Sequence, residues 1–71
     1  MESDFIYTAL IEKFVAEKLA AKANIEIYMG RSVGVAEHPD VIETMDGLVE
    51  KYCAAAEKLE RFQKDFESRG K

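Results

Sequence analysis

The sequence has little cysteine, proline, glycine or histidine, and each scarcity excludes a class of protein. Its 71 residues include one cysteine, one proline, four glycines and one histidine. The single cysteine, Cys53, cannot form an internal disulfide, and a lone thiol is typical of a reducing cytosol. With 48% hydrophobic residues the chain is too apolar to be disordered. The formal charge of −4 gives the whole chain no electrostatic attraction to nucleic acid or to an anionic membrane.

The N-terminal part of the sequence also lacks the features of a targeting or membrane segment. Its start, Met1 to Asp4, is acidic, and Glu12 and Lys13 soon interrupt the apolar residues that follow. This pattern fits neither a signal peptide nor a transmembrane span. We therefore expect a cytoplasmic protein with no membrane partner.

Apolar residues at helical spacing dominate the second half of the chain. They follow one another at steps of four and three, which keeps one stripe on one side of a helix. This seam consists of Val41, Met45, Leu48, Tyr52, Ala55, Leu59, Phe62 and Phe66. Charged residues fill the positions between them, including the acid-first pair Glu57 and Arg61, which are four residues apart. The spacing predicts a helix over 39–67.

The first half predicts another helix, over 4–29, with a less regular seam. This seam consists of Tyr7, Ile11, Phe14, Ala21, Ile25 and Tyr28. Lys18 interrupts it, either by extending along its own stem to the rim of the helix pair or as a buried polar residue that fixes the pairing register. Ser3 or Asp4 is placed to cap the start of the helix, and Gly30 is placed to end it in a left-handed conformation.

The segment between the predicted helices, Gly30 to Asp40, holds the residues that core packing does not explain. Either His38 caps the second helix before Pro39, or Asp40 caps it and Glu43 completes a capping box. The candidate functional residues of this loop are Arg31, Glu37, His38 and Asp40. A catalytic histidine needs an orienting partner and a pocket, so a site here would have to be shared between subunits.

Each predicted helix carries a second apolar stripe in addition to its seam. In the first helix the stripe consists of Ala9, Ala16, Leu19, Ala20, Ala23 and Ile27. In the second helix it consists of Ile42, Val49, Cys53 and Ala56. A helix that contacts two or more neighbours needs such a broad apolar face, although alanines also occur on exposed faces because they raise helix propensity.

These stripes predict the fold class, which is an all-α antiparallel hairpin, a single domain over 1–71, that assembles into a homo-oligomeric coiled-coil bundle. One seam facing one neighbour buries too little apolar surface to offset the ordering entropy of about sixty residues. We expect the seam residues of both helices to form the oligomer interface. The expected partner is the chain itself, as a dimer first and a trimer next.

Residues that carry chemistry form no cluster in the sequence, so we expect no catalytic residue, no cofactor, no metal site and no enzyme. Inward Glu-x-x-His pairs of the ferritin-like kind are missing, and the predicted neighbours of Cys53 make it a packed core thiol. Lys13, Lys18 and Lys22 fall in one stretch of helix, but glutamates intersperse them. This arrangement argues against nucleic acid as a partner.

Three stretches together resemble a group of viral proteins. They are I-E-I-Y (Ile25 to Tyr28), V-G-V-A-E-H-P-D (Val33 to Asp40) and A-E-K-L-E (Ala56 to Glu60). Over about half the chain they resemble small uncharacterised proteins of tailed phages that infect marine cyanobacteria. The resemblance implies a helical hairpin, a viral source and hence the host cytoplasm, and it implies no activity.

Two hypotheses for function follow from the sequence. The first is a non-enzymatic interaction or regulatory protein, a homo-oligomeric bundle that binds a host or phage protein. The alternative is a small-molecule or catalytic site between subunits, built around Glu37, His38 and Asp40.

Overall fold

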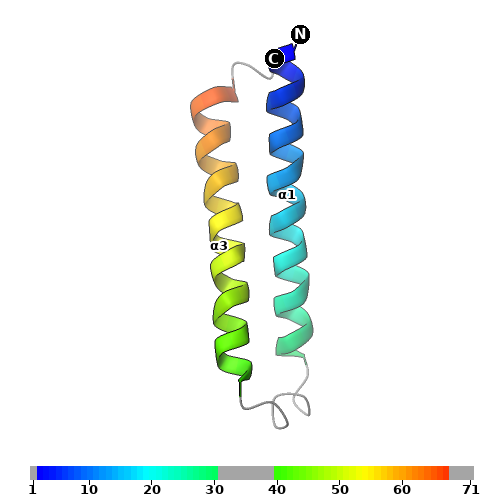
Figure 1. Cartoon of the computed structure of the whole chain (residues 1–71), viewed down its shortest axis with the longest axis vertical. Coiled ribbons are helices and arrows are strands. Elements are labelled where there is room, and N and C mark those ends of the chain that lie inside the picture. The colour runs from blue at the N-terminus through cyan, green and yellow to red at the C-terminus, as the bar shows by residue number, and fades with distance from the viewer. Residues whose placement is uncertain (1, 31–39, 68–71) are drawn as a thin grey trace.

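The protein is an antiparallel pair of long helices, as the sequence predicts. The computed structural model describes residues 2–30 and 40–67, and its helices are α1 (Glu2–Met29) and α3 (Val41–Phe66). The two helices lie side by side along almost their whole length (Figure 1). With 28 and 26 residues they are each about 40 Å long at 1.5 Å per residue. The molecule is accordingly elongated, with extents of 51 × 14 × 13 Å.

The predicted end of α1 at residue 29 is confirmed, but its predicted start and both of its predicted caps are wrong. The helix begins at Glu2, so Ser3 and Asp4 lie inside its first turn and neither is the residue that precedes the helix. An acidic residue in a first turn is favourable because the helix dipole is positive there. At the other end Gly30 has no positive φ, and its amide donates to the Glu26 carbonyl at 3.1 Å. Gly30 therefore continues the helical turn, and no left-handed cap forms.

The start of α3 also differs from the predicted capping box. Asp40 is the N-cap, and its carbonyl accepts the Thr44 amide at 3.0 Å, but its side chain makes no capping hydrogen bond. Its backbone, with φ −88° and ψ 7°, lies in the bridge region between the helical and extended conformations. An N-cap side chain usually bonds the helix amides from an extended backbone, so this conformation explains the missing bond. The alternative cap, His38 before Pro39, lies outside the described residues.

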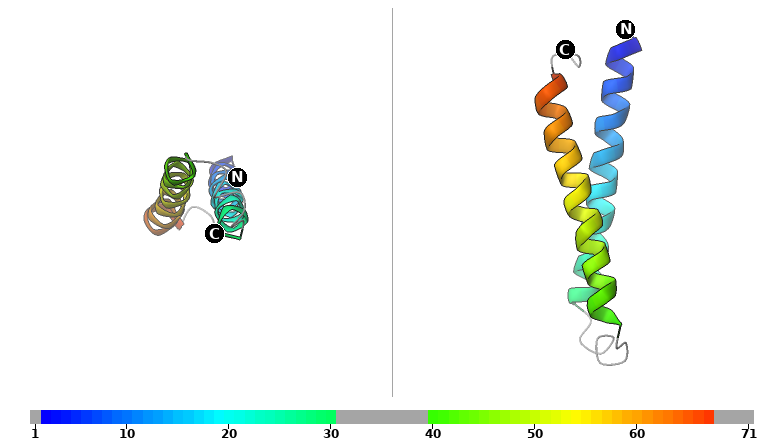
Figure 2. Two further views of the ribbon diagram at one scale, coloured as in Figure 1. Left: turned by 90° about the horizontal axis from the view of Figure 1, so that it is seen from below. Right: turned by 60° about the vertical axis from the view of Figure 1, so that its left-hand side comes forward.

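The predicted seams of α1 and α3 face each other. Figure 2 shows the two helices adjacent to each other, with their axes inclined. Among the side chains that the structure describes, only Ala21, Val41 and Ala55 are buried. The small side chains of Ala21 and Ala55 allow the two helices to approach closely at mid-length. Most other seam residues are half-buried, because a single neighbouring helix covers only one side of each. The hairpin therefore has a continuous seam but hardly any enclosed core.

Aromatic rings fill the seam towards the free ends of the two helices. The Phe62 ring stacks on Tyr7 with 5.3 Å between centroids and meets Phe14 edge-on at 6.0 Å. Phe66 lies 5.2 Å from Phe62 but remains 43% exposed. It belongs to the last turn of α3, where the contact with the Phe62 ring covers one side of it. Phe66 is thus the predicted seam residue that the hairpin leaves exposed.

Candidate functional site

The loop residues predicted to carry function are mostly beyond the described part of the chain. Arg31, Glu37 and His38 lie outside the described residues, and Asp40 is exposed at the start of α3. The surfaces that the structure does describe are the two broad sides of the hairpin, one on each side of the seam. They differ in chemistry, and we describe each in turn.

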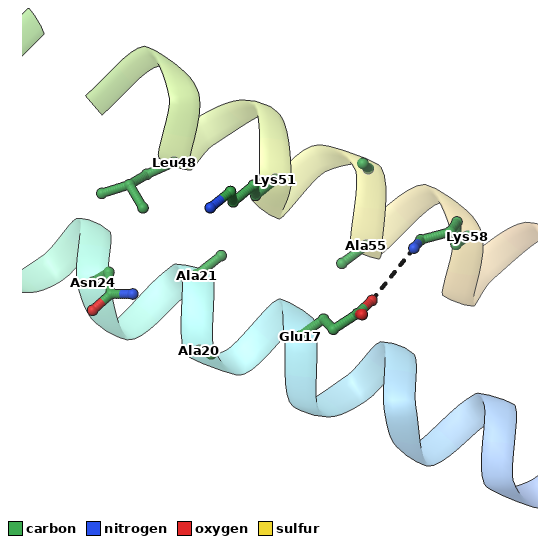
Figure 3. A pocket seen from close by; sticks show the side chains of 9 residues that line it. Glu17, Ala20, Ala21, Asn24, Leu48, Lys51, Ala55 and Lys58 are labelled. Carbon is green, nitrogen blue, oxygen red and sulfur yellow. Dashed lines mark hydrogen bonds and ion pairs between the residues drawn. The ribbon is translucent and has the colours of Figure 1, made fainter. Parts of the chain in front are cut away.

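One side of the hairpin, which we call the charged face, is defined by Glu17 and Asn24 of α1 and by Lys51 and Lys58 of α3. Seven-residue spacing places each pair on one flank of its helix. With small residues such as Ala21 and Ala55 as its floor, this side forms an open groove of about 390 Å³ (Figure 3).

Glu17 makes two ion pairs on this face. The Lys58 ammonium lies 3.3 Å from one Glu17 carboxylate oxygen, and Lys13 donates to the other from the preceding turn of α1. The hydrogen bond from Lys13 is the main cause that lowers the pKa of Glu17, and the bond from Lys58 adds to it, while desolvation opposes them. Glu17 is therefore held as a carboxylate that links α1 to α3.

Lys58 also contacts the aromatic part of the seam, which the sequence analysis missed. Its ammonium lies 5.0 Å from the centroid of the Phe14 ring, within the range of a cation–π interaction. In the sequence, Glu17 and Asn24 are visible as polar positions beside the first seam. The partner of Glu17, Lys58, is 41 residues away, so the sequence does not indicate this pairing. The predicted pair of Glu57 and Arg61 is wrong, because Arg61 lies 3.7 Å from Asp65 instead.

The opposite side of the hairpin exposes apolar residues, and we call it the apolar face. It is defined by Leu19, Met29, Ile42, Val49, Cys53 and Ala56. In α3 the last four recur at steps of seven, four and three on the flank away from Lys51 and Lys58. In α1, Leu19 and Met29 occupy the flank away from Glu17 and Asn24, and the exposed residues Lys22 and Glu26 lie between them on the same stripe. Leu19, Met29, Ile42 and Val49 expose 57%, 75%, 74% and 42% of their surface.

Cys53 is exposed on this face, so the predicted packed core thiol is wrong for the single hairpin. It follows the seam residue Tyr52 by one position, so it lies beyond the side of α3 that α1 covers. A shallow cavity of about 440 Å³ beside it is lined by Lys18, Tyr52 and Ala56, with Glu60 and Gln63. Lys18 is half-buried there, which agrees with the prediction that it extends along its stem to the rim.

The second stripe of α1 does not join that of α3 in one surface. Ala9, Ala16 and Ala23 are exposed on the outer side of α1, which faces away from α3. Ala20 lines the groove of the charged face instead. Leu19 is thus the member of this predicted stripe that lies on the apolar face.

The described residues contain no group of three or more His, Cys, Asp or Glu side chains that could hold a metal ion. The described surface therefore has two sides of different chemistry, the charged face and the apolar face.

Neither described helix is long and apolar enough to cross a lipid bilayer.

Comparison with known proteins gives no relative: no family model, no curated protein and no solved structure matches the chain.

Proposed function

We propose that this chain is a non-enzymatic interaction protein that acts as a homo-oligomeric helical bundle, with a dimer as the first expectation. One observation carries the proposal. In the described part of the chain the buried side chains are two alanines and one valine, whereas eight large apolar side chains are exposed. So many exposed large apolar side chains on so small a chain support a contact site for another protein.

The size of the exposed surface supports the same proposal. The chain has 5678 Å² of accessible surface and a mass of 8.0 kDa. A compact monomer of that mass exposes about 4,450 Å², so the whole chain exposes roughly 1,200 Å² more. Small domains have little stability to spare, and association with another copy removes such surface from water.

Light scattering on the purified chain during gel filtration tests the proposal. The expected mass is at least twice the chain mass of 8.0 kDa at micromolar concentration. A folded species of single-chain mass over the whole concentration range would overturn it.

The proposed partner beyond the chain itself is a protein of the phage or its host, which follows from the resemblance at Val33 to Asp40. Affinity capture from infected cells, with the charge-substituted variants described below as controls, tests this part separately. If nothing is enriched above those controls, the second partner is rejected and the oligomer stands on its own measurement.

A further inference from the structure

We propose that the groove of the charged face binds an acidic amphipathic helix of another protein, whose carboxylates contact the Lys51 ammonium. The inference rests on the proposed interaction function. It adds to that function the surface that a partner contacts and the chemistry that the partner carries.

Lys51 is the cation of the groove that the hairpin leaves without a counterion. Lys58, the other lysine that lines the groove, is paired with Glu17, which also binds Lys13. Within residues 2–30 and 40–67, Lys51 makes no ion pair. Figure 3 shows its side chain lying along the groove towards Leu48. A carboxylate from outside the hairpin therefore reaches Lys51 without displacing a contact that holds α1 to α3.

The local charge of the groove is opposite in sign to the charge of the chain. Three lysines stand against the single carboxylate of Glu17, which leaves two positive charges here on a chain of formal charge −4. Complementary charge attracts and orients a partner, and like charge repels it. A helix with acids on one stripe is therefore drawn to the groove. It is repelled from the outer side of α3, which carries Glu43, Glu50 and Glu57 at steps of seven.

The floor of the groove fits a helix that runs along the hairpin. Four alanines form this floor, namely Ala20 and Ala21 of α1 and Ala54 and Ala55 of α3. Small side chains let a third helix approach to the interaxial distance of about 8–10 Å that packed helices adopt. Lys51 and Lys58 are two turns apart along α3, about 10.5 Å, so acids at steps of seven on the partner helix match their spacing.

Nucleic acid and anionic membranes match the groove less well than an acidic helix does. Glu17 lies inside the groove, and the chain around it is acidic, so a long polyphosphate or a lipid surface meets repulsion beyond the lysines. A single helix contacts the groove without covering the acidic sides of the hairpin.

A labelled synthetic helix tests the inference by fluorescence anisotropy. The probe is an alanine-rich peptide of about 22 residues, long enough to be helical, with glutamate at every seventh position and glutamine at the other polar positions. Its counterpart has glutamine in place of each glutamate. The proteins are the wild type, Lys51→Glu and the matched control Lys64→Glu. Lys64 is an exposed lysine on the outer side of the same helix, so both variants change the charge of the chain equally.

The expected result is that the wild type binds the glutamate probe more tightly than its counterpart. Lys51→Glu should weaken this binding at least about tenfold, and Lys64→Glu less than about threefold, because only Lys51 lies in the groove. Equal affinity for both peptides, or equal losses in both variants, overturns the inference. If circular dichroism shows that Lys51→Glu loses helix, Lys51→Gln replaces it, with Lys64→Gln as its control.

The competing occupants are measured on the same samples. Tighter binding of a single-stranded RNA or of phosphatidylserine vesicles, lost in Lys51→Glu alone, assigns the groove to another anion and overturns the acidic helix. A lower oligomer mass in Lys51→Glu alone assigns the groove to another copy of the chain and also overturns it. A single-chain mass of the wild type rejects the proposed oligomer, whatever the peptide does.

Discussion

The charged and apolar faces flank the same seam in the same pair of helices, yet they present opposite surfaces to water. On the charged face Glu17 and Lys58 connect α1 to α3 within one chain. On the apolar face Leu19, Met29 and Ile42 contact solvent over more than half of their surface. The two helices therefore pair with each other on the charged face, whereas the other face leaves these large apolar side chains in water.

This difference explains how a hairpin with so little enclosed core has a defined geometry. The seam and the Glu17–Lys58 pair fix how α1 lies against α3, but exposed ion pairs add little stability. Most of the remaining apolar surface is available for association. We expect folding and assembly to be coupled, as in many obligate homodimers.

The largest effect is expected from Phe62→Ala, which damages the seam that both faces share. The ring contacts Tyr7, Phe14 and Phe66, and removing a large aromatic side chain from such a cluster costs about 3 kcal/mol of unfolding free energy. Urea denaturation measures the loss. The control is Ile6→Ala, which removes an exposed side chain and should change stability by less than about 0.5 kcal/mol. Equal losses in the two variants would show that the aromatic cluster does not stabilise the hairpin.

The next effect separates the two faces. Val49→Asp places a charge at the centre of the apolar face and should raise the dissociation constant of the oligomer at least about 100-fold, or 2.7 kcal/mol. Ala54→Asp places the same residue in α3 on the charged face. It costs more helix propensity than Val49→Asp does, because alanine is the better helix former, and should still change the dissociation constant by less than about threefold. Sedimentation measures both constants. If both variants dissociate alike, the faces are not distinct in function.

A smaller effect, of opposite sign, is expected from Gly47→Ala. Gly47 lies inside α3, seven residues before Ala54, and a Cβ at this position meets nothing within 4 Å. Alanine in a helix interior is more favourable than glycine by about 0.8 kcal/mol, so the variant should unfold at higher temperature with an unchanged oligomer mass. Scanning calorimetry with light scattering measures both properties. A destabilised or dissociated variant would mean that this position is covered by another copy.

The smallest effect concerns pH and the charged face. The pKa of Glu17 is lowered from its ordinary value of 4.5, so its contribution to stability is present above that value and is lost as the pH falls through the lowered pKa. Thermal unfolding of the wild type and of Glu17→Gln should therefore converge on acidification below about pH 4.5. We expect a small difference, because 39% of the Glu17 side chain is exposed and solvent screens its ion pairs. A gap that widens in acid would contradict the assigned hydrogen bonds from Lys13 and Lys58.

The periodicity of the sequence predicted both helices, their antiparallel pairing and nearly all of the seam. It succeeded because steps of four and three over 26 residues leave one way to place Leu48, Ala55 and Leu59 on one side of a helix. The helix ends were less predictable. At Asp40 and Gly30 several capping arrangements differ little in free energy, so local residue type does not decide among them.

The two faces were only partly predictable. The sequence showed a second apolar stripe on each helix but not that the stripe of α1 follows its outer side. It also showed Glu17 beside the seam but not its pairing with Lys58. Both depend on how α1 and α3 are rotated against each other, which contacts between distant residues fix. The candidate loop residues Arg31, Glu37 and His38 stay predictions.

The most direct test of the central claim, that the hairpin depends on a second copy, is the thermal unfolding midpoint of the wild type at increasing protein concentration. Mass action predicts that the midpoint of a coupled dimer rises by about 5–10 °C between 1 and 100 µM chain. A midpoint that stays constant over this range, with the mass of a single chain, would show that the hairpin is stable alone and would contradict the account.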